Sequence, residues 1–284
     1  MFVNKTIVGG YKYLITSLLL LLMYGCVNVP TQQQRINIAD ALAEQNGWNK
    51  SSVKGDYFNL TSYTGLATKS DLLTVYIEGD GFAWLTRSRP SMDPTPLNPV
   101  GLKLALAQQR GQAAYLARPC QFVLESRSKN CSNQYWTNKR FSNEVINDFN
   151  IALTLLKKQF SAITLRLVGY SGGATVALLV AARRGDIESV VTVAGNLDHG
   201  AWAEFHNLTP LYGSLNPIDY SVQLENIKQV HFVGDQDTVS PLILAKQFAQ
   251  QFSSNVDIEV VVVKNQDHGC CWEKIWPGLI GQLN

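Results

Sequence analysis

Short apolar segments alternate with helix-like segments over most of the chain, and this alternation constrains the fold most. Apolar runs of strand length occupy 72–77, 113–117, 163–168, 189–193, 229–233 and 258–263. A helical spacing of apolar residues is found at 38–47, 141–160, 173–184 and 242–252, and residues 57–64 alternate as an edge or antiparallel strand does. Apolar strands that alternate with helices predict an α/β protein with a mostly parallel central sheet flanked by helices.

Residues 196–224 do not follow this alternation. They lie between two predicted strands and carry Pro, Tyr, Trp and His without a clear period. Many of the side chains are apolar or aromatic, which a solvated linker does not need. A long non-periodic connection of this kind is typical of a functional segment, so we predict a small cap insertion over 196–224.

Charge and composition exclude some classes of protein. The chain has 284 residues, of which 46% are hydrophobic and only 16% are charged, a balance that argues against disorder. Its 24 Lys and Arg stand against 22 Asp and Glu. A net charge this small gives no reason to expect nucleic acid as a partner.

The N-terminus has the pattern of an export signal. Lys5 and Lys12 are the only charged residues of 1–25, and they precede an apolar run at 13–24. That run is short for the ~20 residues of a membrane-spanning helix, so 1–25 reads as a signal peptide. Removing it takes away both lysines and no acid, which leaves the remaining charges balanced and implies no acidic polymer as a substrate.

The end of this segment resembles a bacterial lipobox. Residues 22–26 read Leu-Met-Tyr-Gly-Cys, although Met23 and Tyr24 depart from the usual Leu and small residue. The resemblance implies that Cys26 is the lipid-carrying first residue of the mature chain, and Val27 after it favours the outer membrane. We therefore expect export to the bacterial cell envelope, with a membrane contact through this lipid or a signal anchor. Ordinary cleavage at small residues and an uncleaved anchor are the alternatives.

Four further cysteines are relevant to whether the protein is exported. Cys120 and Cys131 bracket a ten-residue stretch that a disulfide can close, which would leave Cys270 and Cys271 as a vicinal pair or as two free thiols. Disulfides are typical of exported proteins, and four cysteines allow three pairings. The chain lacks a Cys-x-x-Cys motif and a nearby pair of histidines, so we expect no metal site.

The motif Gly-Tyr-Ser-Gly-Gly at 169–173 is the strongest chemical signal. It lies between the strand predicted at 163–168 and a small-residue helix. A nucleophile elbow needs glycines around the serine because the turn is too tight for a Cβ, and the turn holds Oγ above the sheet edge. Ser171 is therefore the candidate nucleophile. A phosphate-binding loop is disfavoured because the Lys of a Walker sequence is absent.

A serine needs a base, and the base needs an orienting acid. The stretch 234–241 reads Gly-Asp-Gln-Asp-Thr-Val-Ser-Pro, and His268 is the only histidine beyond it. The order Ser171, Asp237, His268, each just past a predicted strand, resembles the α/β-hydrolase superfamily. The resemblance covers about 57–284 and implies an α/β-hydrolase fold with these three residues as the catalytic triad.

The other acids and histidines near these motifs are weaker candidates than Asp237 and His268. Asp235 is the alternative acid, although the loop spacing favours Asp237, and Asp267 is expected to be a solvated turn residue. His231 lies within a predicted strand and is expected in the core. The remaining histidines, His199 and His206, lie in the cap segment, where packing is the favoured role.

The oxyanion hole should combine two backbone amides. One is Gly172, directly after the nucleophile, and the other should come from the loop after strand 72–77, at Asp80 or Gly81. The family often has His-Gly where this chain has Glu78-Gly79. A carboxylate so close to a developing oxyanion is unfavourable unless its side chain turns away, and a Gly-rich turn with no such role is the alternative.

These features predict a serine hydrolase that cleaves carboxylic esters or related acyl bonds. The substrate is then a small-molecule or acyl compound, and no cofactor is required. Peptidase, amidase and acyltransferase activities use the same site, and a catalytically silent envelope binding protein is the alternative of another class. We expect a signal peptide at 1–25, a tether at 26–36 and a hydrolase domain at 37–284. Substrate contacts are expected from four aromatic residues: Tyr170, Trp202, Phe205 and Tyr212.

Overall fold

The central sheet has eight strands in the order β1-β2-β4-β3-β5-β6-β7-β8. The computed structural model describes residues 29–124 and 129–283, and the compact unit begins at Gln32. β2 runs antiparallel to both of its neighbours, and every pair from β4 to β8 is parallel. The strands are β1 (Asn49–Lys54), β2 (Asn59–Thr64), β3 (Leu72–Ile77), β4 (Gln112–Leu116), β5 (Thr164–Tyr170), β6 (Ile187–Val193), β7 (Lys228–Gly234) and β8 (Ile258–Val263).

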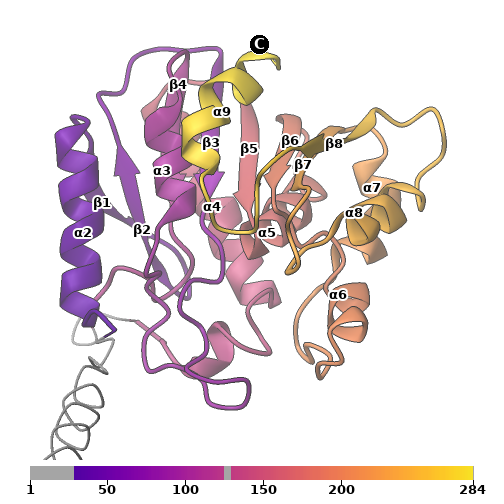
Figure 1. Ribbon diagram of the computed structural model, residues 1–284. Helices are drawn as coiled ribbons and strands as arrows, with labels where there is room; N and C mark the ends of the chain where they lie inside the picture. The colour runs from indigo at the N-terminus through magenta and orange to yellow at the C-terminus, as the bar shows by residue number, and fades with distance from the viewer. Residues whose placement is uncertain (1–28, 125–128, 284) are drawn as a thin grey trace, which may run out of the picture. The chain divides into compact units, whose positions relative to one another are not determined.

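Helices cover both faces of the sheet (Figure 1). One face packs against α2 (Gln32–Gln45), α3 (Val100–Ala107) and α9 (Trp272–Gly281), and the other against α4 (Asn143–Gln159), α5 (Gly172–Ala181) and α8 (Leu242–Ala249). This arrangement confirms the predicted α/β architecture. Among the described residues, no helix has the length and apolar character that crossing a bilayer requires.

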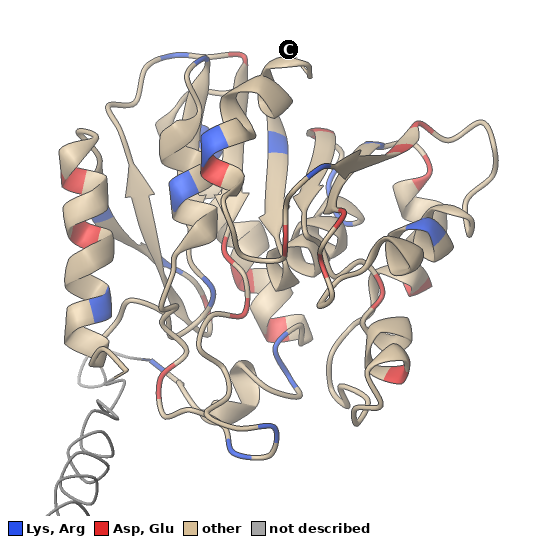
Figure 2. Cartoon of the chain, in the orientation of Figure 1, with Lys and Arg blue, Asp and Glu red and all other residues tan. Residues whose placement is uncertain are grey.

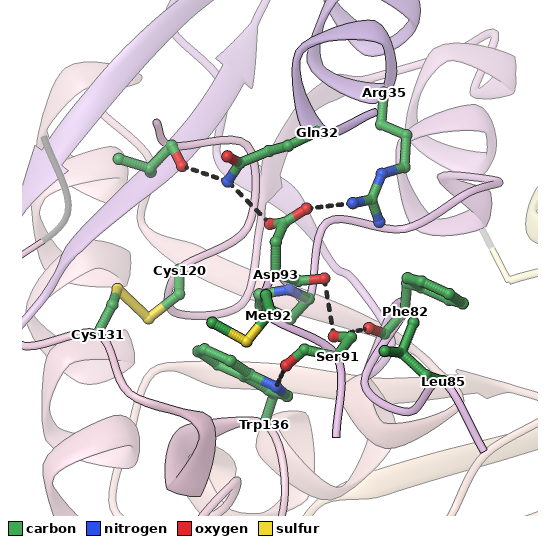
Figure 3. Close-up of a pocket in the computed structure, with 12 residues that line it drawn as sticks. Gln32, Arg35, Phe82, Leu85, Ser91, Met92, Asp93, Cys120, Cys131 and Trp136 are labelled. Carbon is green, nitrogen blue, oxygen red and sulfur yellow. Dashed lines mark hydrogen bonds and ion pairs between the residues drawn. A yellow bond between two sulfur atoms is a disulfide. The ribbon is translucent and has the colours of Figure 1, made fainter. Parts of the chain in front are cut away.

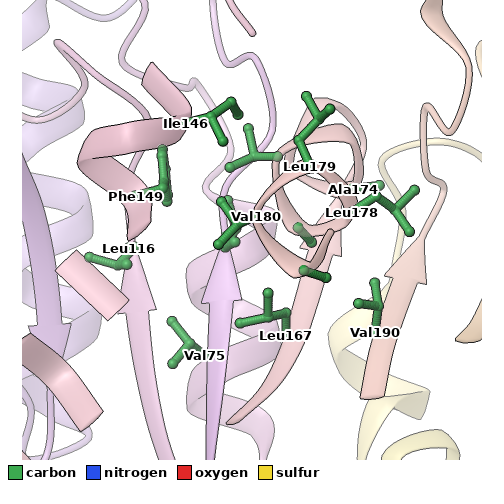
Figure 4. Packing of buried hydrophobic residues seen from close by; sticks show 14 of the residues in the cluster. Val75, Leu116, Ile146, Phe149, Leu167, Ala174, Leu178, Leu179, Val180 and Val190 are labelled. Atoms are coloured by element: carbon green, nitrogen blue, oxygen red, sulfur yellow. The ribbon is translucent and has the colours of Figure 1, made fainter. Parts of the chain in front are cut away.

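Two apolar cores result from the alternation of side chains along the strands. In β3, Val75 belongs to the core beneath α4 and α5, whereas the adjacent Tyr76 belongs to the core beneath α3 and α9. Figure 4 shows the first core, in which Val75 and Leu167 of the sheet face Phe149 and Leu178 of the helices. The parallel strands from β3 to β8 have their carboxyl ends at one edge of the sheet.

The expected tether at 26–36 is wrong in its second half, because α2 begins at Gln32. Ile36, Ala39 and Ala43 are buried at helical spacing, and the adjacent Arg35 is buried in an ion pair with Asp93. The first turn of this helix was not predicted because residues 29–36 are mostly polar. One residue that faces the core there is an arginine, Arg35, and not an apolar residue. The expected signal peptide and Cys26 lie outside the described residues.

Outside the segment 196–224, the elements that were not predicted from the sequence are β1, α3, α9 and the 3-10 helix η2 (Asn133–Tyr135). β1 is mostly exposed and polar, so it lacks the apolar pattern of a strand. α9 contains Pro277, which argues against a helix when the sequence is considered alone. The segment 196–224 carries α6 (His199–Phe205), the 3-10 helix η3 (Pro217–Tyr220) and the short α7 (Ser221–Leu224) between β6 and β7.

Candidate active site

Ser171 lies in a tight turn between β5 and α5. Its backbone has φ 50° and ψ −121°, a conformation that residues with side chains rarely adopt. The flanking glycines have no room for a Cβ: at Gly169 it would lie 2.5 Å from the backbone nitrogen of Ala174, and at Gly173 it would lie 2.3 Å from the backbone oxygen of Ile77. The turn therefore has the close packing expected of a nucleophile elbow.

The structure brings Ser171, His268 and Asp237 together at the carboxyl edge of the sheet. His268 Nε2 lies 3.0 Å from Ser171 Oγ, and His268 Nδ1 lies 2.9 Å from Asp237 Oδ2. A carboxylate only accepts hydrogen bonds, so Nδ1 carries the imidazole proton. Nε2 is then free to accept the proton of the serine hydroxyl.

The loop after β7 fixes the carboxylate of Asp237. Its side chain is fully buried, and Oδ1 also accepts hydrogen bonds from the amides of Val239 and Ser240, each at 2.8 Å. With Oδ1 held in this way, the carboxylate presents Oδ2 to the imidazole. This geometry suits an acid that orients a histidine without exchanging protons itself.

The other two acids of these loops lie outside this arrangement. Asp235 accepts the amide of Asn265 at 2.8 Å and pairs with Lys264 at 3.5 Å. Asp267 is exposed and accepts the amides of Gly269 and Cys270, as a turn residue does. Of the three carboxylates, only Asp237 contacts the imidazole of His268 in the described part of the chain.

The remaining histidines have packing roles. His231 is fully buried in β7, with Nδ1 2.9 Å from Thr192 Oγ1, and burial lowers its pKa to about 3. His199 donates from Nε2 to the backbone oxygen of Leu215 at 3.1 Å, and burial lowers its pKa as well. His206 donates from Nε2 to the backbone oxygen of Val239 at 2.9 Å, which ties α6 to the acid loop.

Free backbone amides surround the nucleophile. The amides of Asp80, Gly81 and Gly172 donate to no partner in the described ranges, and all three residues line the cavity that contains Ser171. Gly81 has φ +68°, and a Cβ there would lie 2.1 Å from the backbone oxygen of Pro94. The glycine therefore allows the loop after β3 to turn with its amides unpaired, as an oxyanion hole needs.

Hydrogen bonds to the carboxylate of Glu78 hold this loop in place, a role that the sequence did not suggest. Its buried carboxylate accepts the amides of Gly79 and Gly101 at 3.0 Å each and the hydroxyl of Tyr115 at 3.0 Å. Burial raises the pKa of Glu78 although these hydrogen bonds oppose the shift. Glu78 thus connects the loop after β3 to the first turn of α3.

The carboxylate of Asp80 does not turn away from the nucleophile turn. A Cβ on Gly172 would lie 2.2 Å from Asp80 Oδ1, so the two residues are in close contact. Instead, Arg118 pairs with Asp80 at 3.1 Å and Arg140 pairs with its other oxygen. Burial alone raises the pKa of Asp80, but the two guanidinium charges outweigh burial and lower it. The negative charge of Asp80 next to Ser171 is therefore compensated.

Two adjoining cavities open over Ser171. The inner cavity, of about 240 Å³, contains Ser171, Gly172 and Asp80, and the outer cavity, of about 480 Å³, extends toward Leu208 and Leu211. Both share four lining residues: Trp84, Arg140, Trp202 and Val239. Because the two cavities share these residues, we call them together the Ser171 groove.

Only one of the four expected aromatic contacts lines the groove. Trp202 does so and donates from Nε1 to the backbone oxygen of Val239 at 2.7 Å. Phe205, at the end of α6, and Tyr212, in the loop that follows, are largely exposed and line neither cavity. Tyr170 lies behind the imidazole, and its hydroxyl donates to the backbone oxygen of His268. The sequence missed Trp84 and Arg140, which come from segments far from the three motifs.

A separate cavity of about 370 Å³ lies beside α2 (Figure 3). Its lining includes none of Ser171, Asp237 and His268. Gln32 donates to Asp93 Oδ1 at 3.0 Å, and Arg35 pairs with the other oxygen of the same carboxylate. The Cys120–Cys131 disulfide forms part of its wall. The cavity lies between α2 and the loop after β3, and the Ser91 hydroxyl in its wall donates to the backbone oxygens of Phe82 and Asp93.

Both cysteine pairs are disulfides. Cys120 and Cys131 are bonded as the sequence suggested, and Cys270 and Cys271 are bonded to each other. In the described part of the chain, no three His, Cys, Asp or Glu side chains gather as a metal site would require.

Solved structures with the same architecture include several hydrolases. An esterase from Pyrococcus furiosus has a TM-score of 0.56 and 14% identity over 83% of this chain and 88% of its own. Est1E from Butyrivibrio proteoclasticus with ferulic acid bound has a TM-score of 0.58 and 13% identity over 82% and 97%. An alpha-beta serine hydrolase homologue from Coxiella burnetii has a TM-score of 0.54 and 17% identity over 83% and 95%.

No protein-family model matches the sequence, and no curated protein is similar to it in sequence. At these low identities the structural likeness bears on the fold alone. It confirms that the chain has the α/β-hydrolase fold.

Proposed function

We propose that this protein is a serine hydrolase that cleaves carboxylic esters through an acyl-enzyme on Ser171. One observation carries the proposal: the hydrogen-bonded chain from Ser171 Oγ through the imidazole of His268 to the buried carboxylate of Asp237. This order of groups raises the nucleophilicity of a hydroxyl that is otherwise unreactive at neutral pH.

The first step forms a covalent bond between Ser171 Oγ and the carbonyl carbon of the ester. The hydroxyl proton moves to His268 Nε2, and Asp237 stabilises the imidazolium that results. When the tetrahedral intermediate collapses, the bond to the alcohol breaks and Nε2 returns its proton to the leaving oxygen. Water then attacks the acyl-enzyme in the same way, which releases the acid and restores the serine.

Unpaired amides support the charge that develops on the carbonyl oxygen. Gly172 supplies one, and Asp80 or Gly81 supplies the other, since all three line the inner cavity. Removal of a single oxyanion donor typically costs a factor of about 10²–10³ in rate. The paired guanidinium groups of Arg118 and Arg140 keep the nearby carboxylate from opposing this stabilisation.

The ester class is favoured among the acyl compounds that such a site can cleave. The solved structures with this fold include two esterases, from Pyrococcus furiosus and Butyrivibrio proteoclasticus, and also an acylaminoacyl peptidase from Pyrococcus horikoshii. Trp84 and Trp202 line the groove as a surface for an apolar acyl or alcohol group. Peptide or amide cleavage and acyl transfer to another alcohol are outcomes that product analysis separates.

Fluorophosphonate labelling of the purified protein tests the proposal. We expect one label on Ser171, located by peptide mass spectrometry, and hydrolysis of short p-nitrophenyl esters. Ser171→Ala should lose both the label and the hydrolysis, whereas Ser253→Ala, at an exposed position away from the site, should keep both. A folded protein that neither labels nor hydrolyses any ester or peptide of a test panel would overturn it.

We also propose that the protein is exported and anchored in the cell envelope through a lipid on Cys26. The sequence of 13–26 supports this, and the disulfide between Cys120 and Cys131 suits an oxidising compartment. Palmitate labelling in cells should yield a membrane-bound, labelled product, and Cys26→Ser should abolish the label. A soluble, unlabelled wild-type product would contradict the anchor.

A further inference from the structure

The outer part of the Ser171 groove carries positive charge only. Its lining includes Arg87 and Arg140, and none of the described residues that line it is acidic. Arg87 is exposed and forms no ion pair or side-chain hydrogen bond with the described residues. Figure 2 shows basic residues on the loop after β3 at the bottom of the view, and the basic residues of this loop are Arg87 and Arg89.

Two guanidinium groups also meet at the inner end of the groove. Asp80 is one carboxylate between two guanidinium groups, those of Arg118 and Arg140. Burial lowers the pKa of Arg118 to about 10, which leaves it protonated at neutral pH. The two guanidinium groups therefore share the carboxylate of Asp80, and Arg118 also interacts with the buried carboxylate of Glu78. The positive charge of Arg140 is thus only partly offset by Asp80.

Arg140 presents this charge to the groove. Its Nε donates to the backbone oxygen of Thr137 at 2.8 Å, and Nη1 pairs with Asp80. Nη2 has no hydrogen-bond partner among the residues that the structure describes, although the residue is only 6% exposed. Since Arg140 lines both cavities, this donor is available to a group that enters the groove.

We infer that the groove selects esters with an anionic group at the far end of an apolar chain, bound by Arg140 and Arg87. The inference rests on the proposed hydrolase function and names its substrate class. Trp84 and Trp202 contact the chain, and the guanidinium groups bind a carboxylate or a phosphate. A cationic substrate is disfavoured by the same two charges.

A different role for Arg140 makes a different prediction. If the residue only holds Asp80 in the oxyanion loop, its replacement slows the hydrolysis of neutral and anionic esters by the same factor. If it binds the substrate's charge, the replacement also lowers the ratio of the two rates. The ratio of kcat/KM values within each variant therefore separates the two roles.

Methyl hexanoate and monomethyl adipate form a matched pair, because the second carries a carboxylate on a chain of the same length. We expect the wild-type protein to prefer the adipate ester by at least about tenfold, the range of a charge-assisted hydrogen bond. Arg87→Gln and Arg140→Gln should each lower this preference several-fold, and added salt should weaken it. Arg89→Gln removes the same charge from the same exposed loop without lining the groove, and it should leave the preference intact.

Equal kcat/KM values for the two esters in the wild-type protein, or a ratio unchanged by both substitutions, would overturn the inference while leaving the hydrolase function intact. Binding to Ser171→Ala, measured by calorimetry, tests the inference without catalysis. Monomethyl adipate and hexyl phosphate should each bind more tightly than the uncharged methyl hexanoate, and the tighter of the two identifies the preferred anion. Equal affinity for all three would also overturn the inference.

Discussion

The phenolic hydroxyl of Tyr170 donates a hydrogen bond to the backbone oxygen of His268 at 3.1 Å. Their rings are 5.7 Å apart, centroid to centroid. Burial raises the pKa of Tyr170, so the hydroxyl keeps its proton at neutral pH and remains a donor. The residue before the nucleophile thus fixes the backbone of the base, which couples the loops after β5 and β8.

Tyr170→Phe should slow the reaction while keeping the fold. The substitution removes one hydrogen bond, worth about 1 kcal/mol, and loosens the position of the imidazole. We expect kcat to fall roughly fivefold with little change in KM, measured on a short p-nitrophenyl ester. Tyr212→Phe, on an exposed ring outside the groove, should leave kcat unchanged. If kcat is equally unaffected in both variants, Tyr170 does not position the base.

Asp237→Asn should nearly abolish activity. An amide at this position can donate to Nδ1 of His268, which favours the tautomer that carries its proton on Nε2 and cannot accept the proton of Ser171. We expect kcat to fall by about 10³–10⁴ with the thermal unfolding midpoint close to that of the wild-type protein. Stopped assays over a range of ester concentrations measure the change.

Asp235→Asn is the matched control for this prediction. Asp235 accepts the amide of Asn265 and pairs with Lys264, whose side chain is 81% exposed. Exposed pairs contribute little, so we expect less than about a twofold change in kcat. A larger loss in Asp235→Asn than in Asp237→Asn would reassign the acid.

The sequence predicted the triad because each member follows a strand with a strong local pattern. Ser171 lies in a glycine turn, Asp237 in a loop of recognisable spacing, and His268 is the sole histidine beyond it. Arg140 has no such signal, because it reaches Asp80 across 60 residues of sequence. Glu78 is similar: its partners at Gly101 and Tyr115 become neighbours only when the parallel strands pair.

The folded protein should lose stability below pH 6.5 because of His231. Burial holds the folded pKa of this residue at about 3, whereas its ordinary value is 6.5. Between these values the unfolded chain binds one more proton than the folded one, so stability falls as the pH falls. The slope from one such group is about 1.4 kcal/mol per pH unit. Urea unfolding between pH 7.5 and 5 measures it.

His231→Leu should reduce that slope by up to the contribution of one proton, whatever its effect on stability at pH 7.5. The side chain packs against Phe248 at 5.7 Å between ring centroids, so an apolar replacement fits the site. His206→Leu is the control: its ring contacts the exposed Phe205 and bonds Val239 at the surface. If the slopes of the wild-type protein and His231→Leu coincide, His231 is not the group that titrates.

The disulfide between Cys120 and Cys131 should contribute about 3 kcal/mol to the free energy of unfolding. It closes a loop with a sequence separation of 11, and the entropy that such a loop loses in the unfolded chain corresponds to this amount. Cys120→Ala combined with Cys131→Ala should therefore lower the urea midpoint, and reduction of the wild-type protein should lower it similarly. The reductant should not shift the midpoint of the double variant further, because Cys270 and Cys271 are adjacent and enclose no intervening chain. A double variant as stable as the oxidised wild-type protein would contradict this entropic contribution.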